Sequence, residues 1–320
     1  MPFRALASRS SLLLLLALAT HAAACSDATI TPTPASDGGP GLDAGPGDAQ
    51  PPSEAAVDAG TATHVRLVAA NTTSGTKQSY EAAGVRIFQG LHPDIVMIQE
   101  FDYALGDLRT FVDTAFGKDF VFFVEPRASG IPNGIVSRFP ILESGAWADA
   151  NTPDRAFAYA RIDVPGPIDL WTVSVHLLTT GAGARSTEAK QLRDYIKAKV
   201  PAGDYLAIGG DFNAESSNEQ CILDISEEVV VDGPFPVDQS GNANTSGNRT
   251  KPHDWLFVRD NLDKRETPVK IGASSFDAGL VFDSRVFTPL TDVAPVLAAD
   301  SGTSGMQHMP VVRDFTFGGN

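Results

Sequence analysis

The segment Leu206 to Glu215, LAIGGDFNAE, carries the residue types best suited to chemistry in this chain. Its apolar run is typical of a buried strand, and it ends in two glycines followed by Asp211 and Asn213. Side chains alternate along a strand, so a carboxylate and an amide two positions apart face the same way. Such a pair can share one metal ion or one phosphate, and the alternative is that Asp and Asn after Gly cap a turn.

Other apolar runs end in the same kinds of polar residue. They are followed by Asn71, Glu100, His176, Asp254 and His308. None of these segments supplies a cysteine nucleophile or a serine-containing elbow. Hard oxygen ligands with few imidazoles suit Mg²⁺ or Mn²⁺ better than Zn²⁺, and two histidines remain for proton transfer. The pattern therefore predicts a divalent-cation site with imidazole groups beside it.

The elements that must position these residues alternate between strands and helices. Hydrophobic periodicity predicts amphipathic helices over residues 80–91, 102–116 and 189–200. β-rich apolar runs predict strands at 65–70, 95–98, 120–124, 134–137, 157–164, 170–177, 206–211, 255–258, 280–282 and 311–317. Residues 216–252 are rich in Asn, Gly and Ser, with a weak strand at 229–231, and are expected to form loops. This order favours an α/β or α+β sandwich with more than one sheet.

Seven motifs in this order resemble the endonuclease/exonuclease/phosphatase superfamily, the DNase I-like proteins that include apurinic endonucleases, sphingomyelinases and inositol-polyphosphate 5-phosphatases. The motifs are Asn71, PDIVMIQE ending in Glu100, NGIVSRFPI beginning at Asn133, VSVHLL around His176, GGDFN, HDWLFV around Asp254 and QHMPVV around His308. The resemblance spans roughly residues 65–317. It implies a four-layer α/β/β/α sandwich of two packed mixed sheets and Mg²⁺-dependent hydrolysis of phosphoesters.

The resemblance also implies roles for the metal site and for water. Glu100 would be the principal ligand of Mg²⁺ or Mn²⁺, and Asn71 would add an amide contact to the metal or the phosphate. Asp211 and Asn213 would position the attacking water and the scissile phosphate. Asn133 would help to line the pocket.

Further implied roles concern the two histidines and the substrate. His308, paired with Asp254, would stabilise or activate the reacting phosphate, and His176 would contact a phosphate oxygen or assist the leaving group. Arg155 and Arg249 could bind phosphate, with solvated or paired surface positions as the alternative. The general base stays unassigned.

The chain departs from the family pattern at one position. Where the family has Ser-Asp-His, this chain has Met306, Gln307 and His308, so a neutral amide replaces a carboxylate. Gln307 can still bind substrate through hydrogen bonds, but one negative charge is lost near the metal. Asp292 and Asp300 are candidate substitutes for that charge.

The first 63 residues predict export and a tether. Two arginines before an apolar stretch at 12–19 indicate a signal peptide over residues 1–24, followed by Cys25 in a position suited to lipidation. Ordinary secretion without a lipid is the alternative. Residues 25–63 contain no Lys, Arg or aromatic residue, which predicts a disordered tether before a single domain at 64–320. The protein is then an exported monomer that meets a membrane only through this lipid.

Composition limits the mode of substrate binding. The 320-residue chain is 42% hydrophobic and 20% charged, with a formal charge of −15, which argues against a broad basic surface for nucleic acid. A polyanion must therefore bind at a focused site. DNA is the first expected substrate, and a phospholipid headgroup or a small phosphoester is the second. The loops 71–77 and 232–251 would set specificity. Within the second loop, the Asn-rich segment 242–248 is expected to be flexible. The rival is a catalytically silent binding module with the same fold.

Overall fold

The computed structural model describes residues 61–71, 81–126 and 130–319. The expected export signal and nearly all of the expected tether lie outside these residues. Among the described residues, no helix combines the length and hydrophobicity that a bilayer crossing requires.

A seven-stranded mixed sheet holds the first strand and the last. Its strands follow the order β10-β14-β1-β2-β4-β3, with β13 also pairing with β14. Strand β1 is parallel to β2, and its other partner β14 is antiparallel. The bounds are β1 (Thr63–Ala70), β2 (Ile95–Ile98), β3 (Val121–Val124), β4 (Gly134–Ser137), β10 (Glu266–Thr267), β13 (Leu280–Val281) and β14 (Val311–Phe317).

A five-stranded sheet packs against it, in sequence order from β5 to β9. Strands β7 and β8 are parallel and the other neighbours are antiparallel. The bounds are β5 (Ile141–Ala148), β6 (Ala156–Ile162), β7 (Leu170–His176), β8 (Tyr205–Asp211) and β9 (Asp254–Val258), and a separate hairpin joins β11 (Val269–Ile271) to β12 (Ser274–Phe276). Both sheets are mixed, as expected.

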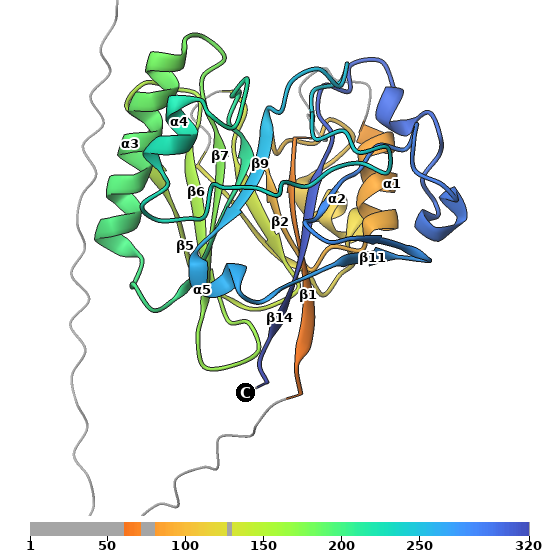
Figure 1. Cartoon of the computed structure of the whole chain (residues 1–320), viewed down its shortest axis with the longest axis horizontal. Coiled ribbons are helices and arrows are strands. Elements are labelled where there is room, and N and C mark those ends of the chain that lie inside the picture. Colours follow the sequence, from red (N-terminus) through yellow and green to blue (C-terminus); the bar gives the residue numbers. More distant parts are fainter. Residues whose placement is uncertain (1–60, 72–80, 127–129, 320) are drawn as a thin grey trace, which may run out of the picture. The chain divides into compact units, whose positions relative to one another are not determined.

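Helices cover the outer face of each sheet (Figure 1). On the seven-stranded sheet lie α1 (Glu81–Leu91) and α2 (Leu108–Ala115), and on the five-stranded sheet lie α3 (Ala182–Lys199) and α4 (Gln220–Asp224). The short helices α5 (Asp260–Asp263), η1 (Leu290–Val293) and η2 (Asp300–Gly302) lie in connections. This arrangement confirms the α/β/β/α sandwich.

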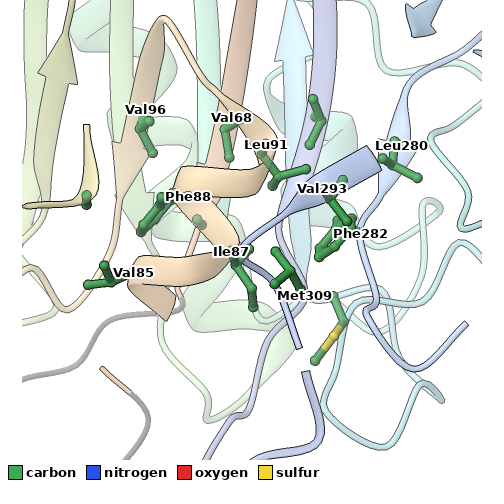
Figure 2. Close-up of a cluster of buried hydrophobic side chains, with 14 of the residues drawn as sticks. Val68, Val85, Ile87, Phe88, Leu91, Val96, Leu280, Phe282, Val293 and Met309 are labelled. Carbon is green, nitrogen blue, oxygen red and sulfur yellow. The ribbon is translucent and has the colours of Figure 1, made fainter. Parts of the chain in front are cut away.

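Three apolar layers hold the sandwich together. Strand β1 shows why the runs are mainly apolar: Leu67 belongs to the layer between the sheets, whereas Val68 belongs to the layer under α1. Burial of both faces removes the polar alternation of an exposed strand. Figure 2 shows the layer under α1, which includes Phe88, Leu91, Val68 and Met309. Met309 directly follows His308 in the chain, so its burial in this layer anchors the backbone next to His308.

Two glycines let the sheets approach each other beneath the end of β8. A Cβ on Gly209 would lie 2.8 Å from the Met97 side chain in the facing sheet. Gly210 has φ +146°, and a Cβ there would lie 2.1 Å from the carbonyl oxygen of Val175. No side chain fits at this point, so the GGD sequence is required by packing as well as by the turn.

The structure departs from the expected elements in a few places. Strand β5 and the short elements β10, β11, β12 and α4 were not predicted. The weak strand expected at 229–231 is only an isolated bridge between Val230 and Val258. These segments are short or, as in β5, largely exposed, so they carry little apolar periodicity.

Candidate active site

Asp211 is the centre of the site. Its Oδ2 lies 3.3 Å from Asn71 Nδ2, 3.4 Å from His176 Nε2 and 3.4 Å from His308 Nε2. Strand register explains part of this convergence, because Asp211 on β8 is paired with His176 on β7 and with Asp254 on β9. Asp211 is 1% exposed. Three strand ends, those of β1, β7 and β9, and the segment before β14 therefore bring polar side chains to the one carboxylate on β8.

His308 is held by a second carboxylate. Its Nδ1 lies 2.9 Å from Asp254 Oδ2, and the backbone N–H of Asp254 donates to Thr245 Oγ1 at 2.8 Å. Burial acts to lower the pKa of His308, but the charges of Asp254 and Asp211 outweigh it and raise the pKa to about 10. The imidazolium form is therefore favoured at neutral pH, with Nε2 directed toward Asp211.

The pKa of His176 shifts in the opposite direction to that of His308. Burial lowers its pKa to about 3, even though Asp211 acts to raise it. Its Nδ1 is buried without a hydrogen-bond partner among the described residues. The site thus contains one charged and one neutral imidazole on either side of the same carboxylate.

The segment that follows His176 is held by buried side chains. Arg155 Nε donates to the carbonyl oxygen of His176 at 2.6 Å, and Arg185 donates to the carbonyl oxygens of residues 178 and 179. The backbone N–H of Leu178 donates to Glu188 Oε2 at 3.0 Å. Burial raises the pKa of Glu188 to about 8, and the neighbouring carboxyl group of Asp149 adds to the shift.

Glu100 and Asn71 provide the oxygen donors for a hard cation. Asn71 Nδ2 donates to Glu100 Oε1 at 3.3 Å, while Asn71 Oδ1 is buried and has no hydrogen-bond partner among residues the structure describes. Glu100 has φ +54°, a conformation rare outside glycine and often found at functional sites. A carboxylate beside an unpaired amide oxygen fits Mg²⁺ or Mn²⁺.

A second donor set lies next to the first. Oxygen and nitrogen atoms of Asp211, Asp254 and His308 all lie within 4.8 Å of one another. A cation bound there would compete with the hydrogen bond between His308 and Asp254, so the Glu100 side of the site is the better fit for a resident metal.

Asn213 takes part in the turn after β8, which was the alternative to a catalytic role, and it also lines the cavity beside His308. Its backbone has φ +49°, and its N–H donates to Asp211 Oδ1 at 2.8 Å. Its side-chain Nδ2 donates to the carbonyl oxygen of Leu177 at 2.9 Å. Asn213 therefore orients Asp211 and joins it to the segment after β7.

Two of the expected substrate-binding side chains are engaged with the protein. Asn133 is fully buried, and its Nδ2 donates to the carbonyl oxygen of Ala156 at 2.7 Å. Its backbone N–H donates to Glu125 Oε1 at 2.5 Å, and burial raises the pKa of Glu125 to about 7. The Arg155 guanidinium donates hydrogen bonds from Nε to the carbonyl oxygen of His176 and from Nη2 to that of Leu177. Both residues support the backbone next to the site.

Arg249 adopts the paired role that was its alternative. It forms ion pairs with Asp238 and with Asp283, whose Oδ2 lies 3.2 Å from Arg249 Nε. These contacts help to order the Asn-rich segment 242–248, which was expected to be flexible. Gly247 N donates to the Gln307 carbonyl at 2.6 Å. Ion pairs with the buried carboxylates of Asp238 and Asp283 hold the loop, and the local sequence does not reveal them.

An open cavity adjoins the catalytic residues on one side. It has a volume of about 400 Å³, and its walls include Asn213, His308, Lys251, His253, Asn248 and Gln307. The Gln307 side chain is exposed. The expected specificity loop 232–251 supplies part of this wall, whereas the other one, beyond Asn71, lies outside the described residues.

Neither aspartate proposed to replace the charge missing at position 307 does so. Asp300 is buried and bound by Arg86, with Nη2 2.5 Å from Oδ1. Asp292 is exposed, and its side chain lies against Gly272 in the β11–β12 turn. The charge lost at position 307 is therefore not restored by these residues.

Besides Arg185, Glu188 and Glu125, sequence reasoning missed other residues that support the site. Gln99 Nε2 donates to Ser174 Oγ at 2.8 Å and so joins the two sheets beneath Glu100. Thr245 supports Asp254 as described, and the His253 ring lies edge-on to His308 with centroids 6.3 Å apart. Of these residues, Gln99 could have been found from the sequence. It is a polar residue at the end of a buried strand, directly before Glu100, and such a residue needs a hydrogen-bond partner.

The fold matches several solved structures. The human Nocturnin catalytic domain with bound sulfate anion is 14% identical, with a TM-score of 0.55 over 79% of this chain and 94% of that one. An endonuclease/exonuclease/phosphatase from Beutenbergia cavernae DSM 12333 is 17% identical, with a TM-score of 0.53 over 80% and 72%. TDP2 from Caenorhabditis elegans is 14% identical, with a TM-score of 0.51 over 79% and 74%. At these identities the likeness establishes the fold alone.

Sequence comparison gives the family directly. A search of curated protein sequences found no match. The model of the Endonuclease/Exonuclease/phosphatase family matches residues 81–275, more than half of the chain. The chain therefore belongs to the endonuclease/exonuclease/phosphatase family, whose members are metal-dependent phosphoester hydrolases.

Proposed function

We propose that this protein is an exported phosphodiesterase that uses Mg²⁺ or Mn²⁺, with DNA as the first candidate substrate. The observation that carries the proposal is the contact of one buried carboxylate oxygen, Asp211 Oδ2, with Asn71, His176 and His308. Glu100 joins this cluster through Asn71. A phosphodiester needs this combination, because it is an anion that repels hydroxide.

Each group has a task in this reaction. Glu100 and Asn71 Oδ1 would hold the cation, which when bound neutralises charge on the phosphate. The His308 imidazolium, oriented by Asp254, donates a hydrogen bond to a phosphate oxygen. Asp211 Oδ2 accepts a hydrogen bond from the attacking water. Neutral His176 contacts a further phosphate oxygen or the leaving group.

The experiment measures phosphate-ester cleavage by the purified protein. Bis-p-nitrophenyl phosphate is incubated with EDTA, Mg²⁺, Mn²⁺, Ca²⁺ or Zn²⁺, and release of p-nitrophenol is followed. We expect turnover with Mg²⁺ or Mn²⁺ and none with EDTA. Plasmid DNA, sphingomyelin and inositol phosphates then separate a nuclease from a sphingomyelinase-like or inositol-phosphatase-like enzyme.

A catalytically silent binding module is the rival. Gln307 favours it, because the replacement of a carboxylate leaves less negative charge near the cation. The geometry of Glu100, Asp211, Asp254 and His308 opposes it, because an unused site has no need of two buried carboxylates on one imidazole. Absence of metal-dependent cleavage of every substrate in the panel would support the silent module.

A location outside the cytoplasm also belongs to this proposal. It rests on the basic and apolar N-terminal segment, on Cys25, and on the uncharged-to-acidic composition of residues 26–63. A lipid at Cys25 would keep the enzyme at a membrane surface.

A further inference from the structure

The cavity beside His308 differs in charge from the rest of the molecule. Its walls contain Lys251 and two histidines and no carboxylate. Four other cavities among the described residues each have at least two carboxylates in their walls. In a chain of net charge −15, a cavity without acidic residues next to a phosphate-handling site is an anion-compatible pocket.

Lys251 has a fixed backbone and an adaptable side chain. Its N–H donates to Ser246 Oγ at 2.9 Å, and its carbonyl oxygen accepts from the N–H groups of Thr245 and Ser246. Its Nζ lies 2.9 Å from Glu215 Oε2, in a pair whose side chains are 42% and 63% exposed. Exposed pairs contribute little stability, so the ammonium group can exchange this partner for an anion.

The same wall offers uncharged groups for hydrogen bonding. His253, Gln307 and Asn248 line the cavity together with Lys251 and the catalytic His308. The loop is ordered by the contacts of Arg249 with Asp238 and Asp283. A Lys charge with amide and imidazole groups on an ordered loop is a set that binds phosphate oxygens.

We propose that this cavity binds a second phosphate group of the substrate, next to the phosphate at the reaction centre, with Lys251 as its principal contact. The inference rests on the proposed phosphodiesterase function and extends it to a substrate class: phosphodiesters that carry a neighbouring phosphate, as in an oligonucleotide. A phosphodiester with neutral or cationic substituents would leave the cavity without its anion.

Binding of dinucleotides tests the inference without depending on turnover. The probes are TpT and its two phosphorylated forms, pTpT and TpTp, which place the extra phosphate on opposite sides of the diester. Their affinities for the full-length protein are measured by titration calorimetry in EDTA, so that metal-dependent cleavage does not occur. We expect one phosphorylated form to bind about tenfold more tightly than TpT, as one charge-assisted contact predicts.

Variants then locate the contact. Lys251→Met should reduce the affinity ratio between the phosphorylated form and TpT to near one. Lys264→Met removes the same charge from an exposed side chain outside the cavity and should keep the ratio. Glu215→Gln frees Lys251 from its partner and should keep or increase the ratio. Thermal unfolding of each variant shows that the fold is intact.

The outcomes separate the two proposals. Equal affinities of the wild type for TpT, pTpT and TpTp would overturn the second phosphate site, and so would an unchanged ratio in a folded Lys251→Met protein. Cleavage of TpT with Mg²⁺ reports on the phosphodiesterase activity alone. If the phosphorylated dinucleotide bound tenfold more tightly than TpT but TpT were not cleaved, the second phosphate site would stand and the phosphodiesterase activity would be rejected.

Discussion

Asp254 Oδ2 lies 2.9 Å from His308 Nδ1 although 54 residues separate them in the chain. The other ring nitrogen of His308 lies 3.4 Å from Asp211 Oδ2. The imidazole is thus held between two buried carboxylates, one on each of the neighbouring strands β8 and β9. This arrangement both orients the ring and favours its charged form.

Asp254→Asn should therefore lower kcat by about 10²–10⁴-fold. The amide removes the charge that keeps His308 protonated, and it allows the wrong ring tautomer. Steady-state kinetics on bis-p-nitrophenyl phosphate with Mg²⁺ measure the effect. Asp163→Asn, at an exposed carboxylate outside the site, is the matched control and should retain wild-type kcat. Wild-type kcat in a folded Asp254→Asn protein would contradict the assigned role of this pair.

Glu100→Gln should abolish measurable Mg²⁺ binding, because a neutral amide replaces the carboxylate that faces Asn71. Calorimetric titration of metal into the EDTA-treated protein measures this without any substrate. Glu143→Gln, at an exposed position on β5, should bind metal like the wild type. If Glu100→Gln bound Mg²⁺ as tightly as the wild type, the metal would instead be assigned to Asp211, Asp254 and His308.

Gly210→Ala should destabilise the fold by about 2–4 kcal/mol, since strain at φ +146° adds to the clash with the Val175 carbonyl. Urea unfolding followed by tryptophan fluorescence measures the change. Gly203→Ala is the control, because a Cβ there would meet no atom within 4 Å. An equal, small effect of both substitutions would show that β8 tolerates a side chain beneath the site.

Glu188→Gln should stabilise the protein at high pH and have little effect at low pH. The pKa of Glu188 is raised from 4.5 to about 8 in the folded protein, so the folded state holds a proton that the unfolded state has lost between these values. The contribution of this group to stability is present below pH 4.5 and is lost as pH rises through 8. We expect the variant to raise Tm by about 2–4 °C at pH 9.

Thermal unfolding at pH 5, 7 and 9 gives the required profile for wild type and Glu188→Gln. Glu227→Gln, at an exposed glutamate paired with Lys197, is the control and should show no such pH-dependent gain. A constant Tm difference between Glu188→Gln and wild type across pH would show that Glu188 is ionised throughout.

Cys25→Ala should abolish incorporation of a labelled fatty acid when the full chain is produced in a bacterial host. The prediction follows from the position of Cys25 after the apolar segment. Metabolic labelling and membrane fractionation of wild type and variant measure it. Cys221→Ala is the matched control, because the Cys221 thiol is buried in the folded domain. Equal labelling of wild type and Cys25→Ala would reject a lipid at this residue.

Local pattern was sufficient for the main strands and helices. The run IVMI at 95–98 and the run GIVS at 134–137 have the predicted bounds, because strands buried on both faces are mainly apolar. Strand β5 was missed, because most of its side chains are partly or fully exposed and lack that signal. The order of motifs around Glu100, Asp211 and His308 was also sufficient to indicate the family.

The sequence by itself determined which residue types were available at strand ends: carboxylates, amides and imidazoles that suit a hard cation and a phosphate. The tertiary structure decided what each of them touches. Only the register of β8 with β7 and β9 places His176 and Asp254 beside Asp211. Likewise, the buried pairing of Arg249 orders the loop that carries Lys251. Such long-range contacts depend on how strands pair and layers pack, and a linear pattern of residues does not encode those distances locally.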